Sequence, residues 1–139
     1  GPFGHGWTYS AHAIGAAAGV ANLDLLDRLG LVDNAGAVGS YLTRTMAEAL
    51  GDHAHVGEVR GAGMLTAVEL VSDRDSRAGF DPGDKIVPRI VAAMGRHGVI
   101  ARAMPQGDIL GYAPPLCLTR EEADTVVSVT VDSIAEILG

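Results

Sequence analysis

The sequence predicts an α+β fold in which an antiparallel sheet carries helices on one face, preceded by a loop and a helix from another domain. The hydrophobic period changes from helical to β-like near Val56, returns to helical near Asp84, and ends in a strongly capped helix. Hydrophobic residues make up 47% of the chain and charged residues 19%, which favours a packed core over extended disorder.

The first residues predict a loop followed by a buried helix. Residues 1–10 read GPFGHGWTYS, a glycine-punctuated sequence that is typical of a loop. Ser10 is a plausible N-cap for a helix that extends to about Leu29 and ends at Gly30. Because this stretch is nearly all small or apolar, we expect the helix to be buried.

A second helix is expected from about Asp33, with Gly51 as its stop signal. One face of this helix is apolar and comprises Ala35, Val38, Leu42, Met46 and Ala49. An apolar stripe of this kind needs a partner surface.

Four short runs predict the strands of the sheet. Val56–Arg60 and Met64–Val71 are interpreted as a strand pair, because the Gly-Ala-Gly sequence between them is typical of a turn or bulge. Val99–Met104 and Ile109–Tyr112 are interpreted as two further strands around a Pro-Gln-Gly turn.

Two more helices complete the pattern. A polar loop over Ser72–Gly83 leads into an amphipathic helix over Asp84–His97, with Ile86, Ile90 and Met94 on one face. The last helix begins with a capping box formed by Thr119 and Glu122. Its apolar face comprises Ala123, Val126, Val127, Thr130, Ile134 and Ile137.

Charge and composition exclude several classes of function. The net charge of −7 and a pI near 5.0 argue against nucleic-acid binding, which depends on clustered Lys and Arg. No apolar run is long enough to span a bilayer, and no signal-peptide pattern is present. The single cysteine, Cys117, cannot form an internal disulfide and fits a reducing compartment. We therefore expect a cytoplasmic protein that binds neither nucleic acid nor a membrane.

The segment His5–His12 is unusually rich in polar and aromatic side chains. It places two imidazoles, three hydroxyls and an indole beside a helix start. Hydroxyl donors and helix N-termini suit an anionic group such as a phosphate. The residues alone favour the simpler alternative, a capped helix start whose aromatic side chains fill a crevice.

Arg102 is the second candidate for binding an anion, because it lies mid-strand between apolar neighbours. Its planar guanidinium suits a substrate carboxylate through two parallel hydrogen bonds. The alternative, which is favoured for an isolated arginine, is a side chain that reaches solvent or pairs with a local acid such as Asp108.

Other polar residues carry less information. His53 and His55 are typical of surface histidines rather than a metal site, because no further ligand lies at suitable spacing. Cys117 is interpreted as a small core residue, since nothing nearby in the sequence would lower its pKa. Glu69 is either an acid with a function or an outward-facing strand residue.

Several motifs follow one another along the chain. His5–His12 reads HGWTYSAH, Val59–Met64 reads VRGAGM, and Ala113–Leu116 reads APPL, followed by Thr119. In this order they resemble the HG-aromatic-TYSGH, VRGxGL and APPLxxT motifs of class III aminotransferases, which depend on pyridoxal phosphate (PLP) and have fold type I. The resemblance covers nearly the whole chain, and the ordered set is more specific than any single motif.

The resemblance implies roles for particular residues. Thr8 would bind the PLP phosphate of a neighbouring subunit through its hydroxyl and backbone N–H, and Trp7 would border that subunit's substrate pocket, which implies a homodimer. Arg102 matches the mobile arginine with which the amine:pyruvate, or ω-aminotransferase, branch binds a substrate carboxylate. Relatives of the ornithine type carry their carboxylate arginine at the position of Gly111, so Gly111 favours the amine:pyruvate branch.

The resemblance also implies domains and an activity. Residues 1–31 would be the tail of the PLP-binding large domain, and residues 32–139 the C-terminal small domain with a long linker helix. The implied reaction is transfer of an amino group from an amine or ω-amino acid to a keto acid such as pyruvate. The alternatives are a decarboxylating aminotransferase, an aminomutase, or a non-catalytic binding domain of the same fold.

Two positions depart from the family pattern. Ala13 stands where the family usually has proline after the His-containing turn. The only lysine, Lys85, matches no catalytic position, and the family's Schiff-base lysine lies upstream of the TYS segment. We therefore expect a C-terminal fragment that is inactive on its own.

Overall fold

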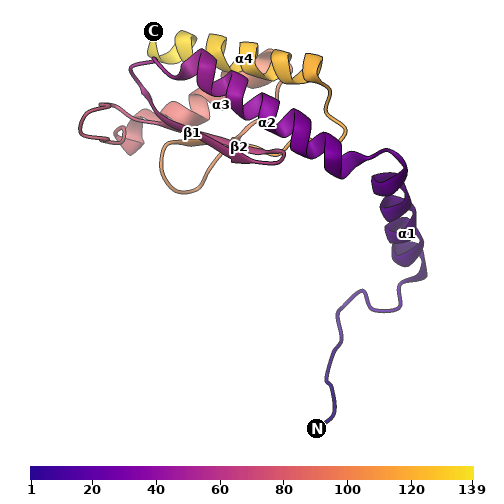
Figure 1. Cartoon of the computed structure of the whole chain (residues 1–139). Coiled ribbons are helices and arrows are strands. Elements are labelled where there is room, and N and C mark those ends of the chain that lie inside the picture. The colour runs from indigo at the N-terminus through magenta and orange to yellow at the C-terminus, as the bar shows by residue number, and fades with distance from the viewer. The chain divides into compact units, whose positions relative to one another are not determined.

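The computed structural model describes residues 1–139. The chain divides into two compact units, residues 1–32 and residues 33–139. In chain order the elements are α1 (Ala13–Arg28), α2 (Leu31–Leu50), β1 (Val56–Ala62), β2 (Leu65–Leu70), a short 3-10 turn (Pro82–Asp84), α3 (Ile86–Arg96), β3 (Arg102–Ala103), β4 (Ile109–Tyr112) and α4 (Arg120–Leu138) (Figure 1). None of the helices combines the length and apolar character that crossing a membrane requires.

Helix α1 begins after His12, so the prediction of Ser10 as its N-cap is wrong. The Nδ1 atom of His12 accepts a hydrogen bond from the backbone N of Gly15 at 2.9 Å and caps the helix. The Oγ atom of Ser10 instead accepts from the backbone N of Trp7 at 2.9 Å, within the preceding loop. The helix ends before Gly30 as predicted, and the φ of +58° there is one that glycine adopts at little cost.

The predicted burial of α1 is also wrong for this chain, because no residue of the helix is buried. Its composition indicates burial, since small and apolar residues occur on every side of the helix. Residues 1–32 contain no second element against which those side chains could pack. The exposed apolar side chains of α1 include Ile14, Val20, Leu23 and Leu25.

Helix α2 is the predicted second helix, and it packs through an apolar stripe. The large side chains that it buries are Val38, Leu42, Met46 and Leu50. Ala49, expected on this face, is exposed. Leu50 takes its place because it lies one helical turn beyond Met46 on the same side of the helix.

The sheet has four strands in the order β1-β2-β4-β3, and every neighbouring pair is antiparallel. Strands β1, β2 and β4 lie close to their predicted ranges. The run predicted over Val99–Met104 contributes only Arg102–Ala103 to the sheet. Its first residues are tied to the end of α3 instead, because the backbone N of Val99 donates to the carbonyl oxygen of Met94 at 3.1 Å.

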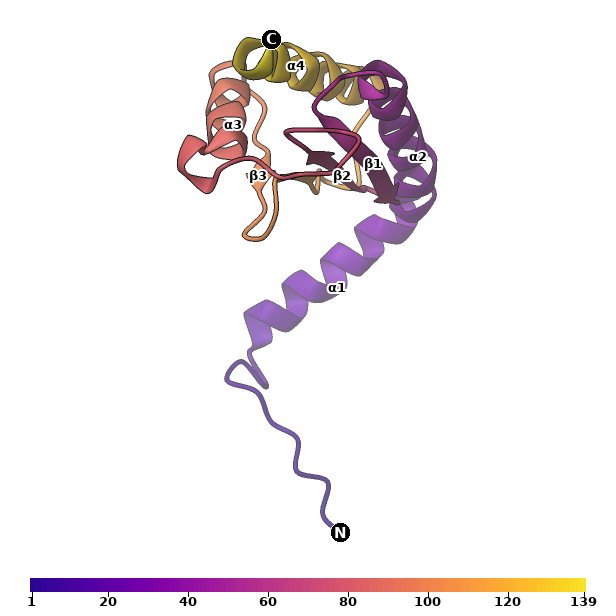
Figure 2. The same ribbon diagram turned by 90° about the vertical axis from the view of Figure 1, so that its left-hand side faces the viewer.

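The two faces of the sheet have different environments. Along β2 the side chains of Thr66, Val68 and Leu70 are buried, whereas Leu65 is 63% exposed. Figures 1 and 2 show α2, α3 and α4 around one side of the strands. The opposite face, called the open face below, is not covered by a helix of residues 33–139, which confirms the predicted α+β class with helices on one face.

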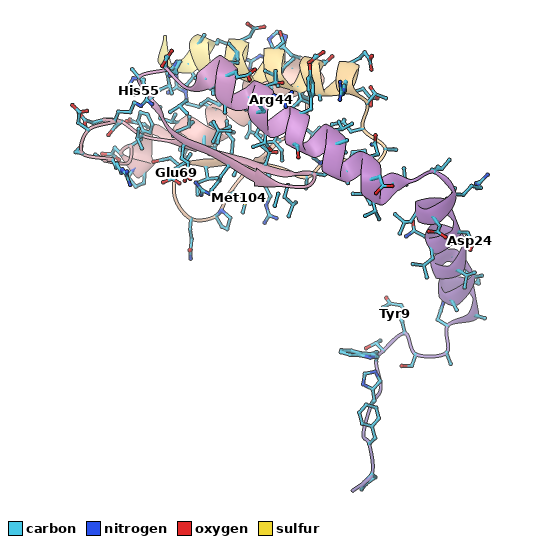
Figure 3. All side chains as sticks on the ribbon, viewed as in Figure 1. Tyr9, Asp24, Arg44, His55, Glu69 and Met104 are labelled. Atoms are coloured by element: carbon cyan, nitrogen blue, oxygen red, sulfur yellow. The ribbon has the colours of Figure 1, made fainter.

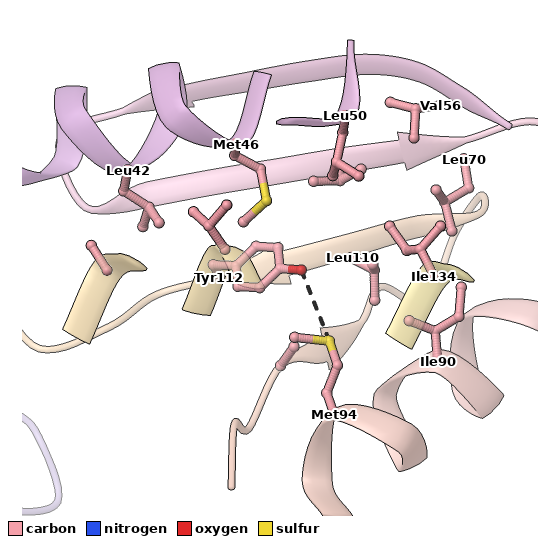
Figure 4. Packing of buried hydrophobic residues seen from close by; sticks show 14 of the residues in the cluster. Leu42, Met46, Leu50, Val56, Leu70, Ile90, Met94, Leu110, Tyr112 and Ile134 are labelled. Carbon is pink, nitrogen blue, oxygen red and sulfur yellow. Dashed lines mark hydrogen bonds between the residues drawn. The ribbon is translucent and has the colours of Figure 1, made fainter. Parts of the chain in front are cut away.

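The core lies between the sheet and these three helices. Leu42 and Met46 from α2, Ile90 and Met94 from α3, and Leu110 from β4 are all fully buried and lie together (Figure 4). The predicted capping box of α4 is confirmed. Thr119 Oγ1 accepts from the backbone N of Glu122 at 3.2 Å, and Glu122 Oε2 accepts from the backbone N of Thr119 at 2.8 Å.

Candidate functional site

The loop before α1 holds the first two candidate residues, Trp7 and Thr8. A turn closes here, because the backbone N of Ser10 donates to the carbonyl oxygen of Trp7 at 3.0 Å. The indole Nε1 of Trp7 donates to Nε2 of His5 at 2.8 Å, and the Trp7 side chain is 72% exposed. Figure 3 shows the aromatic side chains, including Tyr9, projecting from this loop. The alternative in which these aromatics fill a crevice is therefore not seen within this chain.

The donors of this loop fit an anionic phosphate. Trp7, Ser10 and His12 are engaged in local hydrogen bonds, in which Thr8 takes no part. Thr8 also lies in an exposed turn close to the start of α1. A hydroxyl and a nearby helix N-terminus are both suited to a phosphate oxygen.

Arg102 lies on the open face of the sheet in residues 33–139. It pairs with Gly111 across β3 and β4, while Ala103 pairs with Leu110, which is fully buried. Side chains alternate between the two faces of a strand, so Arg102 points away from the core. The structure records Arg102 as exposed and in none of the chain's ion pairs.

The alternative pairing of Arg102 with Asp108 is not found. The Oδ2 atom of Asp108 accepts a hydrogen bond from the backbone N of Phe80 at 2.9 Å and so holds the loop that precedes α3. Arg102 therefore reaches solvent in this chain, which is one of the two alternatives, and its guanidinium is available to a carboxylate.

A second arginine on the open face, Arg60, is not among the residues that the sequence predicts for the site. Its Nη1 atom lies 2.5 Å from Oε2 of Glu69 and 2.7 Å from Oε2 of Glu58. The hydrogen bond to Glu69, with that to Glu58, raises the pKa of Arg60 above its usual value. The two carboxylates neutralise Arg60, and Glu69 is thereby an outward-facing ion-pair partner (Figure 3). Glu58 and Arg60 lie two positions apart in a predicted strand and therefore share one face, which is the signal that could have indicated this group of charges.

A concave pocket of about 660 Å³ also lies on the open face. Ala67 and Gly111, which are neighbours across β2 and β4, contribute to its lining, as do Leu65, Met104 and Ile109. Met104 is not among the residues that the sequence predicts for the site. Its spacing two positions after Arg102 was the available signal, because residues at that spacing in a strand share one face.

The remaining polar candidates serve local structure. His53 Nδ1 accepts from the backbone N of His55 at 3.1 Å, and His55 Nδ1 lies 3.0 Å from the carbonyl oxygen of Val71. Burial, and then the nearby His55, lowers the pKa of His53. No group of three or more potential ligands is placed to hold a metal ion. Cys117 is exposed, so its interpretation as a core residue is wrong; it lies in the turn before α4.

The family of the chain follows from a comparison with known proteins. A model of the family described as Aminotransferase class-III matches residues 1–134. The chain belongs to the class III aminotransferases. Diaminobutyrate–2-oxoglutarate transaminase of Halomonas elongata is 53% identical over 137 residues, which are 99% of this chain and 29% of that protein. Putrescine–pyruvate aminotransferase of Pseudomonas aeruginosa is 35% identical over 130 residues, which are 92% of this chain and 27% of that protein.

Solved structures of transaminases share this fold. A transaminase from directed evolution by ancestral reconstruction matches with a TM-score of 0.94 at 53% identity, covering 99% of this chain and 30% of its own. The (S)-enantioselective ω-transaminase of Thermomicrobium roseum matches with a TM-score of 0.91 at 37% identity, covering 100% of this chain and 30% of its own. A PLP-bound amine transaminase from an uncultivated Pseudomonas species matches with a TM-score of 0.87 at 39% identity, covering 96% of this chain and 30% of its own.

The chain spans about 30% of the length of these class III aminotransferases. The family depends on PLP, and the hydroxyl of Thr8, which takes part in none of the hydrogen bonds of this loop, is chemically suited to a phosphate oxygen. The only lysine, Lys85, lies far along the chain from this loop, in a left-handed conformation with φ of 49° at the start of α3.

Proposed function

We propose that the chain forms part of a PLP-dependent aminotransferase that transfers an amino group from an amine or ω-amino acid to a keto acid such as pyruvate. The observation that carries this proposal is the unpaired Arg102 on the open face of the sheet. Membership of class III supports the reaction type, and the similarity to a putrescine–pyruvate aminotransferase and to ω-transaminases supports the amine:pyruvate branch.

PLP, when bound, supplies the electron sink that makes amino transfer possible. The hydroxyl and backbone N–H of Thr8 would hold its phosphate, and Trp7 would limit the space around the substrate. Under this proposal both residues serve the active site of a neighbouring subunit, so the enzyme is a homodimer. Residues 1–31 then belong to the large domain and residues 32–139 to the small domain.

Arg102 would bind the keto acid. Its planar guanidinium donates two parallel hydrogen bonds to the carboxylate and so fixes the direction in which the keto group points. Each such charge-assisted contact contributes about 1.5–3 kcal/mol when water is excluded. Because Arg102 has no acidic partner on the sheet, no ion pair has to be broken before the substrate binds.

The lysine that carries the cofactor in this family has no counterpart in the chain. Lys85 follows the 3-10 turn at Pro82–Asp84 and begins a surface helix, a place that matches no catalytic position. We therefore expect residues 1–139 to catalyse no amino transfer on their own.

One observation favours a second candidate within the family. The relative that acts on diaminobutyrate and 2-oxoglutarate is 53% identical to this chain, against 35% for the putrescine–pyruvate enzyme. With 2-oxoglutarate as acceptor, Arg102 would bind one of two carboxylates. Initial rates of the complete enzyme with pyruvate and with 2-oxoglutarate, at equal concentrations of one amine, distinguish the two candidates.

The role of Arg102 is tested by Arg102→Ala in the complete enzyme. The KM for pyruvate should rise by about 10-fold or more, because a carboxylate loses its charge-assisted partner. The KM for a neutral amine such as isopropylamine should change little. Equal increases in both KM values would contradict the assignment.

A different experiment tests the reaction class itself. Treating the complete protein with PLP and then borohydride should fix the cofactor to a lysine, which peptide mass spectrometry would locate outside residues 1–139. Failure to fix any PLP would favour the non-catalytic binding domain.

A further inference from the structure

Two histidines close a corner of residues 33–139, where the turn between α2 and β1 meets the end of β2. His53 and His55 belong to this turn, which ends at Val56, the first residue of β1 (Figure 3). Val56 pairs with Leu70, so His55 lies opposite Val71. The backbone N of Val71 donates to the carbonyl oxygen of His55 at 2.9 Å, and the pairing of the two strands thus continues to this point.

The return hydrogen bond of this pair comes from an imidazole and not from the backbone. The backbone N of His55 donates to Nδ1 of His53 at 3.1 Å, and Nδ1 of His55 lies 3.0 Å from the carbonyl oxygen of Val71. A carbonyl oxygen can only accept, so Nδ1 of His55 carries a proton. Nδ1 of His53 accepts and carries none. The two contacts therefore fix opposite tautomers for the two rings.

The acceptor role of His53 is incompatible with a protonated ring. An imidazolium carries a proton on both nitrogens, so the proton on Nδ1 of His53 would point at the N–H of His55 and that hydrogen bond would be lost. The ring of His55, whose centroid is 6.0 Å from that of His53, would also lie beside a positive charge. His55 keeps its own hydrogen bond when it is protonated, because its Nδ1 is already a donor. His53 is therefore the ring whose titration changes the contacts.

No carboxylate offsets a positive charge on His53. Burial, and then the nearby His55, lowers the pKa of His53, and no acid counteracts them. The carboxylates on the surrounding segments have other partners: Glu48 pairs with Arg44, Glu58 and Glu69 with Arg60, Asp73 accepts from Ser76, Asp81 from Gly83, and Asp108 from Phe80. The remaining charged residues of the turn and of the loop after β2 are exposed, namely Asp52, Arg74, Asp75 and Arg77.

The corner also attaches the loop over residues 72–81 to the sheet. The ring of His55 packs against that of Phe80, with the two centroids 5.6 Å apart. A second attachment is the hydrogen bond from the backbone N of Phe80 to Asp108, the residue before β4. Displacement of His55 would therefore remove one of the two attachments of this loop and leave the core in place.

We propose that His53 is a pH-sensitive latch. At mildly acidic pH, protonation of Nδ1 of His53 releases the backbone N–H of His55, and the loop over residues 72–81 loses its contact with the His55 ring. At neutral pH the latch is closed. This device goes beyond the proposed amino transfer and does not depend on it.

The direction of the pH effect follows from proton uptake. Because the pKa of His53 is lowered in the folded protein, the unfolded chain binds the proton first as the pH falls. The stability that the latch contributes is present above about pH 6.5, the ordinary pKa of histidine. It is lost as the pH falls through the lower pKa of folded His53.

Nuclear magnetic resonance of the 139-residue protein tests the tautomers and the release. At about pH 8, where histidine is neutral, ¹⁵N spectra should show Nδ1 of His53 without a proton and Nδ1 of His55 with one. On lowering the pH to about 5, the amide proton of His55 should move upfield with the midpoint of the His53 ring, and the Phe80 signals should follow. A protonated Nδ1 in neutral His53, or a His55 amide that does not follow this ring, overturns the proposal.

A variant separates the latch from the turn that it closes. His53→Asn places an amide oxygen where it can accept the same hydrogen bond but cannot titrate, so the pH-dependent shift of the His55 and Phe80 signals should disappear. His97→Asn is the matched control, because His97 is exposed at the end of α3 and outside the corner, and the shift should remain. A shift that persists in His53→Asn, or one that disappears in His97→Asn, overturns the proposal.

Discussion

At the scale of single residues, Tyr112 shows how a polar group is accommodated in the core. Its hydroxyl lies 3.0 Å from Oγ1 of Thr130 on α4, and its weaker contact with Sδ of Met94 on α3 is 3.9 Å long (Figure 4). Burial raises the pKa of Tyr112 to about 12. One phenol thus connects the sheet to two helices, provided that it stays protonated.

Stability should therefore fall at high pH. The unfolded chain ionises its tyrosines near pH 10, whereas folded Tyr112 resists ionisation up to about pH 12. The contribution of protonated Tyr112 to the free energy of unfolding is present below pH 10. It is lost between pH 10 and 12, at up to about 1.4 kcal/mol per pH unit. Urea unfolding across this range measures the slope, which Tyr112→Phe should reduce. Tyr9→Phe, a change in the exposed loop, should leave the slope as it is, and an equal reduction there would contradict the assignment.

The same variant should lose stability at neutral pH. Tyr112→Phe removes the hydrogen bond to Thr130 and leaves a buried hydroxyl on α4 with only its bond to the carbonyl oxygen of Val126, at 2.7 Å. The expected cost is about 1 kcal/mol in the free energy of unfolding at pH 7. A cost near zero would show that the Tyr112 hydroxyl contributes nothing beyond its packing.

At this scale the sequence predicted which residues are important better than it predicted their hydrogen-bond and ion-pair partners. Arg102 was recognisable because a mid-strand arginine needs an explanation, but its freedom from Asp108 depends on a loop whose path the sequence does not reveal. Ser10 was a reasonable N-cap by residue type. Its hydroxyl accepts from Trp7 instead, because Ala11 has a φ of 61° and the chain turns before the helix begins.

At the scale of elements, α2 and the turn between β1 and β2 approach each other closely. A Cβ atom at Gly39 would overlap the carbonyl oxygen of Gly63, so helix and turn meet backbone to backbone. Gly63 itself has a φ of +54°, a value that favours glycine. The glycines of the Gly-Ala-Gly turn are therefore explained by packing as well as by turn geometry.

Two glycines of α2 should respond in opposite ways to the same change. Gly39→Ala should destabilise residues 33–139 by about 1–3 kcal/mol, because the added methyl group has no room. Gly36→Ala should stabilise them by about 0.5–1 kcal/mol, since nothing lies within 4 Å of its added Cβ and alanine favours the helix. Thermal unfolding of both variants measures the difference, and the same sign for both would contradict this account.

The start of α4 offers a prediction about capping. Thr119→Ala removes the acceptor for the backbone N of Glu122 and should cost about 1 kcal/mol of stability. Thr119→Ser keeps a hydroxyl at this position and should retain most of the stability. Equal losses in the two variants would show that the methyl group of Thr119, and not its hydroxyl, is important.

Elements with strong local signals were predicted most accurately. The capping box and the apolar stripe of α2 depend on neighbours in sequence, and both were found. Strand β3 is much shorter than its run of β-forming residues, because Val99 bonds to the end of α3 and a local pattern does not reveal that competition.

At the scale of the whole molecule, stability is unevenly distributed between the two units. Residues 33–139 contain the hydrophobic core, whereas α1 has no buried residue. An isolated helix as short as the 16 residues of α1 is marginally stable in water. The burial of α1 could not be predicted correctly from composition, because composition shows that a helix needs a partner and not where that partner is.

Hydrogen exchange of the 139-residue protein should reveal this division. The amides of α1 should exchange almost as fast as those of an unstructured peptide, while those of β2 and α4 should be protected by the core. Exchange in α1 as slow as in α4 would show that the helix is covered, for example by a second copy of the chain.

The fluorescence of Trp7 reports on the loop before α1 and not on the core of residues 33–139. Trp7 is the only tryptophan of the chain, and it lies exposed in the loop before α1. Its fluorescence therefore follows events in that loop, and the emission should hardly change when the core of residues 33–139 melts. Ellipticity or tyrosine absorbance has to be used for the core, since Tyr112 belongs to it and Tyr41 packs against it. A change in tryptophan emission on adding a cofactor or another protein would then locate the binding event at the loop.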